Sequence, residues 1–250
     1  MLKEIKNLFS FLTTIPVSMD EDILTDTAKY MFLFPLIGAF IGLLAGLFGW
    51  LTLQVLPGLI VGGLVLGVLL LLTGLHHTDG LLDFGDGVMA HGSPERKVEI
   101  MHDQLTGAGG LSLGIMTFLV TAFAIAELDA GIMVQGLVVV EVSAKLSMVV
   151  GAWAGKAVHE GMNTSFLETM HGKAGNARLV AALVLSFGIA LPLLWLAGAV
   201  AVLAAVLASL VMVEIAHRHF NGVTGDVLGA TNELARMVSL ITLLAMVGWL

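Results

Sequence analysis

One uncharged run constrains this chain more than any other feature: between Met31 and Leu75 there is no Asp, Glu, Lys, Arg or His. At about 1.5 Å per residue, a helix over this run would extend roughly 68 Å, about twice the thickness of a bilayer core. No soluble core is that thick, and Pro57 followed by Gly58 provides a break near the middle. The run therefore predicts two membrane-spanning helices in an integral membrane protein.

The composition agrees with a membrane location. Hydrophobic residues make up 58% of the chain, charged residues make up 12%, and the mean hydropathy is +0.99. Ordinary soluble domains carry about 25% charged residues. The absence of cysteine excludes disulfides, iron–sulfur clusters, thiolate zinc sites and cysteine nucleophiles. The formal net charge of −8 gives no reason to expect a nucleic-acid partner.

Apolar stretches separated by loops of alternating length predict six to seven transmembrane helices. The short loops contain no Lys or Arg, and ten of the eleven cations, Arg236 among them, fall on the opposite side. By the positive-inside rule, the N-terminus and all long loops are then cytoplasmic. We expect an all-α, polytopic helical bundle in the cell membrane, with one catalytic domain over residues 1–250 and its active-site loops in the cytoplasm. The predicted helices are 31–54, 58–75, 107–126, 131–152, 178–196, 198–216 and 234–250.

The first twenty residues differ from a signal peptide. Their apolar part is short, no small-residue cleavage site follows it, and acidic residues come next. We expect residues 1–20 to include an amphipathic segment that lies in the lipid interface and serves as an anchor. The apolar residues at helical spacing are Leu2, Ile5, Leu8, Phe9 and Leu12.

An acidic motif, HHTDGLLDFGDG, follows the uncharged run directly. In a continuing helix, Asp79, Asp83 and Asp86 lie at i, i+4 and i+7 and share one face. His76 would share this face, whereas His77 would point elsewhere. Three like charges on one face need a cation or protonation, and oxygen ligands suit Mg²⁺, Mn²⁺ or Ca²⁺. A solvated acidic loop is the alternative, although acids at a membrane boundary are functional candidates by default.

A second polar segment, SPERKVEIMHDQLTGAGG, begins with the N-terminal signature of a helix at Ser93 and the proline that follows it. Glu99 and Asp103 would share a face of this helix. Arg96 and Lys97 offer contacts to phosphate. A solvated amphipathic helix with no binding role is equally consistent with this segment.

A third segment, HRHFNGVTGDVLGATNELAR, places Asp226 directly after Thr224 and Gly225 at the start of a helix. Glu233 lies two turns further on the same face. The Thr-Gly-Asp turn is common by itself. Its position gives it weight, because it puts another acid where a membrane helix meets the cytoplasm.

Lys145 is the cation that falls within a predicted span, four residues after Glu141. Two interpretations stay open. The two residues could form an intramembrane ion pair that only locks helices together, or Lys145 could present its ammonium group to an anionic substrate.

Together these motifs resemble the cobalamin synthase family, the membrane-embedded adenosylcobinamide-GDP ribazoletransferases. HHTDGLLDFGDGV is similar to the family's H-x-D-G-x-x-D-x-x-D-G motif, and NGVTGDVLGATNEL to its G-G-x-T-G-D-x-x-G-A signature. ERKVEIMHDQLTGAGG resembles the segment between them. Two departures are Asn221, where Gly is usual, and Lys145, where the family carries Arg, the better bidentate phosphate ligand. The matching positions are His77, Asp79, Gly80, Asp83, Asp86, Asp103, Gly107, Thr224, Gly225 and Asp226.

The resemblance implies transfer of a substituted phosphate. Adenosylcobinamide-GDP would react with α-ribazole or its 5′-phosphate and release GMP. Mg²⁺, held by Asp79, Asp83 and Asp86, would neutralise the leaving group. One of these aspartates, or Asp226, would take the proton of the attacking hydroxyl. The expected substrate-binding residues are His77, Arg96, Lys97, Asp103, Gly107, Lys145, Thr224 and Gly225.

Two other functions fit less well. A CDP-alcohol phosphotransferase uses similar aspartate chemistry, but its pattern continues with Ala-Arg, which does not follow Asp79 and Gly80. A cation transporter would place acids near mid-span, and only Glu141 and Glu214 approach that depth. The oligomeric state stays open, a homo-oligomer included.

Overall fold

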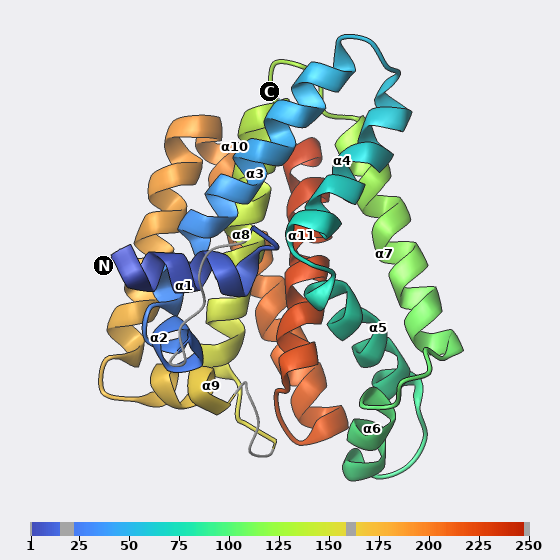
Figure 1. Ribbon diagram of the computed structural model, residues 1–250, viewed down its shortest axis with the longest axis vertical. Coiled ribbons are helices and arrows are strands. Elements are labelled where there is room, and N and C mark those ends of the chain that lie inside the picture. The colour runs from blue at the N-terminus through green and yellow to red at the C-terminus, as the bar shows by residue number, and fades with distance from the viewer. Residues whose placement is uncertain (1, 16–22, 159–163, 248–250) are drawn as a thin grey trace.

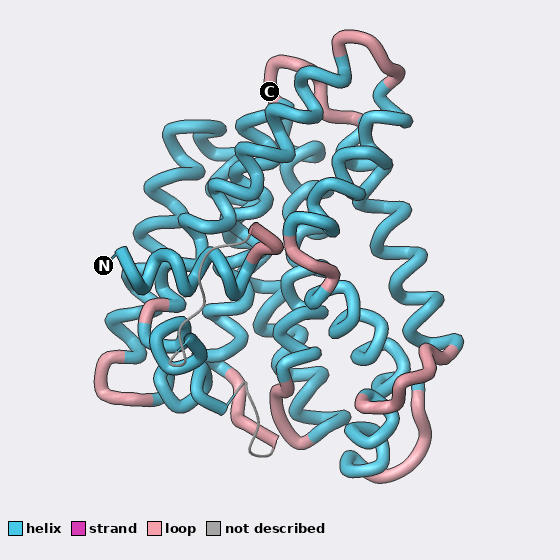
Figure 2. The backbone as a smooth tube through the Cα atoms, in the orientation of Figure 1, coloured by secondary structure: helices cyan, strands magenta, loops and turns pink. Residues whose placement is uncertain are grey.

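The computed structural model describes residues 2–15, 23–158 and 164–247, and Figures 1 and 2 show an all-helical bundle. A short 3₁₀ turn, η1 (Met31–Leu33), precedes α3, and one isolated β-bridge joins Ala157 to Val223. The α-helices are α1 (Leu2–Leu12), α2 (Ile23–Lys29), α3 (Phe34–Leu53), α4 (Gly58–Leu72), α5 (His76–Met89), α6 (Pro94–Met101), α7 (Ala108–Ala126), α8 (Met133–Ala154), α9 (Thr164–His171), α10 (Gly175–Phe220) and α11 (Gly225–Val247).

The prediction of a multi-pass membrane protein is confirmed. Within the described residues, five helices are long and apolar enough to cross a membrane, or six if α4 and α5 form one bent span. One of the five, α10, would extend about 69 Å if it were straight. Instead it turns back at Leu194 and Trp195, where the backbone leaves helical geometry, so it contains the two helices predicted at 178–196 and 198–216. The two arms touch, because a Cβ added at Gly198 would lie 2.5 Å from the carbonyl oxygen of Ala190.

Helix α8 forms the centre of the bundle, and nearly all of its residues are buried. Glycines of α3 let the two backbones approach: Cβ atoms added at Gly38 and Gly46 would collide with the α8 backbone. On another side of α8, the hydroxyl of Ser209 in α10 donates to the carbonyl oxygen of Ser147 at 2.7 Å. Close backbone packing and interhelical hydrogen bonds are the main forces available between helices in lipid.

A charged network joins α8 to α11 inside the bundle. Arg236 is fully buried and pairs with both Glu141 and Glu233, while Lys145 donates to the side-chain oxygen of Asn232 at 2.6 Å. Arg236, expected on the side of the long loops and outside the spans, therefore lies inside a helix that is long and apolar enough to cross a membrane. The helix predicted at 234–250 begins at Gly225, because the opposite charges compensate one another and a span can carry them.

The acidic motif is helical, as expected, and Asp79, Asp83 and Asp86 lie on α5, but this helix does not continue the direction of α4. Gly74 and Leu75 adopt left-handed conformations, with φ of 67° and 63°, and α5 is bent by 97° from α4. The acidic helix therefore leaves the direction of the span and continues to α6 at one end of the bundle (Figure 1). With 14 residues, α5 is too short to cross a membrane by itself.

The N-terminal helix α1 runs across the bundle rather than along it (Figure 1). It buries Leu8 and Leu12 and leaves Lys3 and Lys6 exposed. This orientation fits the amphipathic segment expected within residues 1–20, of which 16–20 lie outside the described residues.

Candidate active site

Two helices bring the acidic motifs together. α5 and α11 pack so closely that a Cβ added at Gly80 would lie 2.8 Å from the carbonyl oxygen of Asp226. A Cβ at Gly229 would lie 3.3 Å from the Cα atom of His77. The glycines of the two motifs thus allow direct backbone contact, and Asp79 and Asp226 consequently border the same cavity.

The first turn of α11 fixes the position of Asp226. Thr224 is buried, and its hydroxyl oxygen accepts from the backbone N–H of Val227 at 3.3 Å, as a helix N-cap does. The same hydroxyl donates to the Asp226 carboxylate at 3.4 Å. Gly225 is exposed, and a Cβ there would meet no atom within 4 Å. Asp226 therefore lies at the positive end of the α11 dipole, beside open space.

Negative charge accumulates around Asp83. Burial and the charges of three neighbouring carboxylates raise the pKa of Asp83 to about 7. Those carboxylates are Asp79, Asp226 and Asp86. Within the described residues, no lysine or arginine forms an ion pair with any of the four aspartates. The site thus carries uncompensated negative charge that a cation would stabilise.

Asp86 has a partner of its own. Its carboxylate accepts from the backbone N–H of Gly107 at 2.6 Å and from that of Gly110 at 2.8 Å. Both donors belong to the N-terminus of α7, where a negative charge is favourable. Asp86 therefore holds α7 against α5, and Gly107, one of the predicted substrate-binding residues, is part of this connection.

The aspartates of α5 and α11 are the candidate ligands for a divalent cation. In the part of the chain that the structure describes, no three His, Cys, Asp or Glu side chains are gathered into a ready-made metal site. Mg²⁺ commonly binds one or two carboxylates and completes its shell with water and substrate phosphates. Asp79, Asp83 and Asp226 provide oxygen ligands with unbalanced charge, so these residues fit Mg²⁺ that binds together with a phosphate substrate.

The α6 segment contacts the site less directly than predicted. Ser93 caps α6, but α6 ends at Met101, so Asp103 does not continue its face. Asp103 instead accepts from the backbone N–H of Leu105 at 3.2 Å in an exposed turn. His102, which sequence reasoning did not select, places Nε2 3.9 Å from the Asp226 carboxylate.

The two basic residues of α6 have partners away from the aspartates. Arg96 forms an exposed ion pair with Glu99 at 2.8 Å. Lys97 lies 2.9 Å from Nδ1 of His219 and ties α6 to the end of α10. Both side chains remain within reach of solvent, so the prediction that they contact phosphate stays a prediction.

The buried Lys145 lies behind the site rather than in it. Its ammonium group is fully enclosed, bonded to Asn232 and 3.9 Å from the Glu141 carboxylate. This geometry favours the first of the two open interpretations: Lys145 pairs with Glu141 within α8, and its hydrogen bond to Asn232 locks α8 to α11.

The histidines at the start of α5 both border the cavity. His76 is exposed, whereas His77 is buried and its Nδ1 atom has no hydrogen-bond partner among the residues that the structure describes. Burial, together with the positive charges of Lys145 and Arg236, holds the pKa of His77 well below its usual range. A neutral imidazole with a free ring nitrogen therefore lies next to the aspartates.

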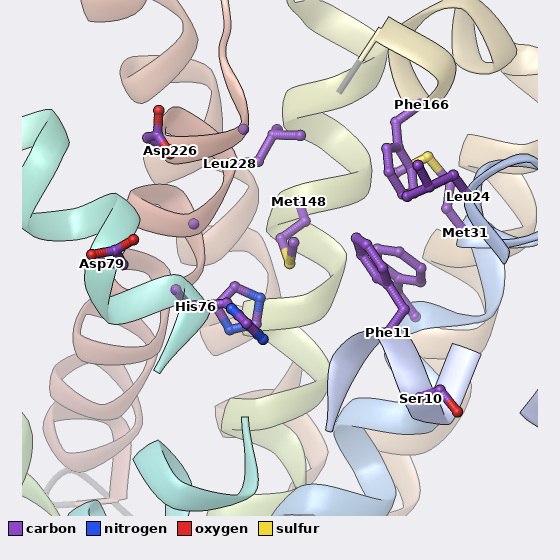
Figure 3. Close-up of a pocket in the computed structure, with 14 residues that line it drawn as sticks. Ser10, Phe11, Leu24, Met31, His76, Asp79, Met148, Phe166, Asp226 and Leu228 are labelled. Atoms are coloured by element: carbon purple, nitrogen blue, oxygen red, sulfur yellow. The ribbon is translucent and has the colours of Figure 1, made fainter. Parts of the chain in front are cut away.

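The cavity has a volume of about 560 Å³ and two chemically different sides. In Figure 3, Asp79 and Asp226 lie on one side, and Phe11 and Phe166 lie on the other, with Met148 between them. Sequence reasoning missed the apolar side, because its residues come from five separate elements and share no local pattern. The apolar side includes Phe11 of α1, Leu24 of α2, Met31 of η1, Phe34 of α3 and Phe166 of α9.

Comparisons with known proteins match nearly the whole length of the chain. A family model described as cobalamin-5-phosphate synthase matches residues 4–244. A relative named adenosylcobinamide-GDP ribazoletransferase from Methanocella arvoryzae is 35% identical over 96% of this chain and 94% of its own. Relatives of the same name from Methanococcoides burtonii and Clostridium acetobutylicum are 33% and 31% identical, over 97% and 95% of this chain and 92% and 94% of their own. No solved structure is significantly similar to the chain.

The family match includes every helix that contributes to the cavity, from α1 to α11. The relatives cover both acidic motifs and the segment between them. The chain therefore belongs to the cobalamin-5-phosphate synthase family.

Proposed function

We propose that the protein transfers the cobinamide-phosphate part of adenosylcobinamide-GDP to α-ribazole or α-ribazole 5′-phosphate, and that GMP leaves. The observation that carries this proposal is the meeting of α5 and α11, which puts Asp79 and Asp226 on one side of a single cavity. The names of the relatives support the choice of substrates.

In this reaction a ribose hydroxyl of the acceptor forms a bond to the cobinamide-side phosphorus, and the bond from that phosphorus to the oxygen of GMP breaks. The hydroxyl proton passes to a carboxylate on the acidic side of the cavity, with Asp79 and Asp226 as the two residues placed there. Thr224 and the α11 N-terminus orient Asp226, and Asp86 fixes α7 beside it.

Mg²⁺ bound to Asp79, Asp83 and Asp226 would supply charge neutralisation for the diphosphate. This set differs from the predicted ligands by exchanging Asp86 for Asp226. Two observations support the exchange: both Asp86 oxygens already accept backbone hydrogen bonds, and Asp226 borders the cavity whereas Asp86 does not. The four aspartates otherwise repel a diphosphate, and the net charge of −8 adds to that repulsion.

The test is an assay of the purified protein in a bilayer, with adenosylcobinamide-GDP, α-ribazole 5′-phosphate and Mg²⁺, in which GMP and the corrinoid product are separated by chromatography. Product formation should require the metal, and at the same Mg²⁺ concentration it should fall sharply in Asp83→Asn. Asp129→Asn is the matched control, since Asp129 lies in the α7–α8 loop and accepts only local backbone bonds. Turnover of CDP-alcohol substrates in place of the cobinamide substrate would contradict the proposal.

We also propose that the protein lies in the cell membrane with the α5–α6 end in the cytoplasm. The α5–α6 and α7–α8 connections lie at opposite ends of the bundle (Figure 1). The chain contains no cysteine, so His91→Cys and Ala130→Cys would each carry a unique label. An impermeant maleimide should label the first in inside-out vesicles and the second in right-side-out vesicles. The reverse pattern would contradict the orientation.

A further inference from the structure

We infer that the apolar side of the cavity binds the base of the acceptor nucleoside, a flat benzimidazole, with the ribose directed toward the carboxylates. This inference rests on the proposed function, because that function supplies α-ribazole as the acceptor. The inference adds to that function the place where the acceptor binds and a physical reason why the protein binds this base.

Three phenylalanines form a continuous aromatic surface on this side. The ring centroids of Phe11 and Phe34 lie 6.3 Å apart, those of Phe11 and Phe166 lie 5.2 Å apart, and those of Phe34 and Phe166 lie 6.2 Å apart. Met148 borders the same surface, whereas Met31 and Phe34 are almost fully buried and support Phe11 and Phe166 from behind. Aromatic rings and thioethers make their best contacts with flat apolar groups.

The volume and the polarity of the cavity favour the benzimidazole nucleoside over the corrinoid and over guanine. About 560 Å³ is within the range of ordinary small-molecule sites, which suits a nucleoside, whereas a complete corrinoid with its amide side chains needs far more space. Guanine would bring amide and amino groups against phenylalanine and methionine, where unpaired polar groups are costly. A dimethylbenzimidazole base has no hydrogen-bond donor and one free ring nitrogen.

The acidic side completes the arrangement. Figure 3 shows Phe11 and Phe166 opposite Asp79 and Asp226, with His76 between the two sides. A base on the aromatic side therefore leaves the attached sugar between the histidines and the carboxylates. A ribose hydroxyl would then face the residues proposed to accept its proton.

Two phenylalanines of α1 provide a matched pair of variants. Phe11 lines the cavity, whereas Phe9 packs on Phe40, with ring centroids 5.0 Å apart, and does not line it. Both are partly buried. Phe11→Ala should raise KM for α-ribazole about tenfold, as expected for the loss of one aromatic contact, and leave KM for adenosylcobinamide-GDP within about twofold. Phe9→Ala should change neither constant, and Phe11→Leu should be intermediate.

Direct binding separates this inference from the proposed function. Calorimetry in detergent with EDTA, using 5,6-dimethylbenzimidazole and guanosine as probes, requires no turnover. The benzimidazole should bind the wild type and Phe9→Ala, bind Phe11→Ala about tenfold more weakly, and not be displaced by guanosine. Displacement by guanosine, or a rise in KM for adenosylcobinamide-GDP alone, would overturn the inference. Benzimidazole binding without any transfer would overturn the proposed function instead.

Discussion

Gly80 lies directly against the backbone of Asp226, so that a single added methyl group would approach the Asp226 carbonyl oxygen to 2.8 Å. This contact joins a residue of the first acidic motif to one of the third across 146 positions of sequence. Because Asp79 of α5 and Asp226 of α11 border the same cavity, the contact between the helices sets the spacing of these two residues.

The first prediction follows from that contact. Gly80→Ala should push α5 away from α11 and lower kcat/KM about 100-fold, since displacements near 1 Å have effects of that size. Gly63→Ala is the control, because Gly63 lies on the exposed face of α4 with nothing within 4 Å of an added Cβ. The measurement is steady-state kinetics of both variants. Equal activity in the two would contradict the role of the contact.

The second prediction concerns the charged network inside the bundle. Glu141→Gln leaves the buried Arg236 and Lys145 with one carboxylate, Glu233, so the free energy of unfolding should fall by about 3–5 kcal/mol. The control is Glu214→Gln in α10, where the exposed pair between Glu214 and Arg218 should contribute little. Thermal unfolding in detergent compares the variants. If both variants have the melting temperature of the wild type, the network does not stabilise the bundle.

The sequence predicted the class of fold, and it selected acidic residues of α5 and α11 that the structure brings close together. Uncharged runs locate spans because lipid offers no partner for exposed backbone or charge. The same rule failed at Arg236, since a charge that is paired inside the bundle no longer marks a loop. The turn of α5 through 97° at two left-handed residues, Gly74 and Leu75, had no local signal strong enough to predict it.

The site was predicted in part, for a related reason. Spacing along one helix shows which aspartates share a face, so Asp79 and Asp83 could be selected. Spacing says nothing of partners on other helices, and the capture of Asp86 by the backbone of Gly107 depends on such a partner. Phe11 and Phe166 meet across 155 positions, which no local pattern records.

The third prediction concerns pH in the absence of divalent metal. A free aspartate has a pKa near 3.9, whereas that of Asp83 is raised to about 7. Between about pH 4 and pH 7, the folded protein therefore holds a proton on Asp83 that the unfolded chain has already lost. The free energy of unfolding consequently falls as the pH rises through that window. In EDTA, the melting temperature should drop more between pH 5 and pH 8 for the wild type than for Asp83→Asn. Identical slopes would contradict the raised pKa.

The last prediction separates the roles of Asp83 and Asp86. Asp86→Asn keeps the shape but offers one acceptor oxygen to two N–H donors, so one hydrogen bond to α7 is lost and about 1–3 kcal/mol of stability with it. The Mg²⁺ concentration for half-maximal activity should stay within about twofold of wild type, because Asp86 is not among the proposed ligands.

Asp83→Asn should leave stability intact and weaken the response to Mg²⁺. It removes a charge that is repelled by three neighbouring carboxylates, so the metal-free protein should melt at or above the wild-type temperature at pH 8. Its half-maximal Mg²⁺ concentration should rise at least about tenfold, since a carboxylate ligand is lost. Melting curves and Mg²⁺ titrations of the two variants give the comparison. A lost Mg²⁺ response in Asp86→Asn with unchanged melting would instead make Asp86 a ligand, as the sequence alone predicts.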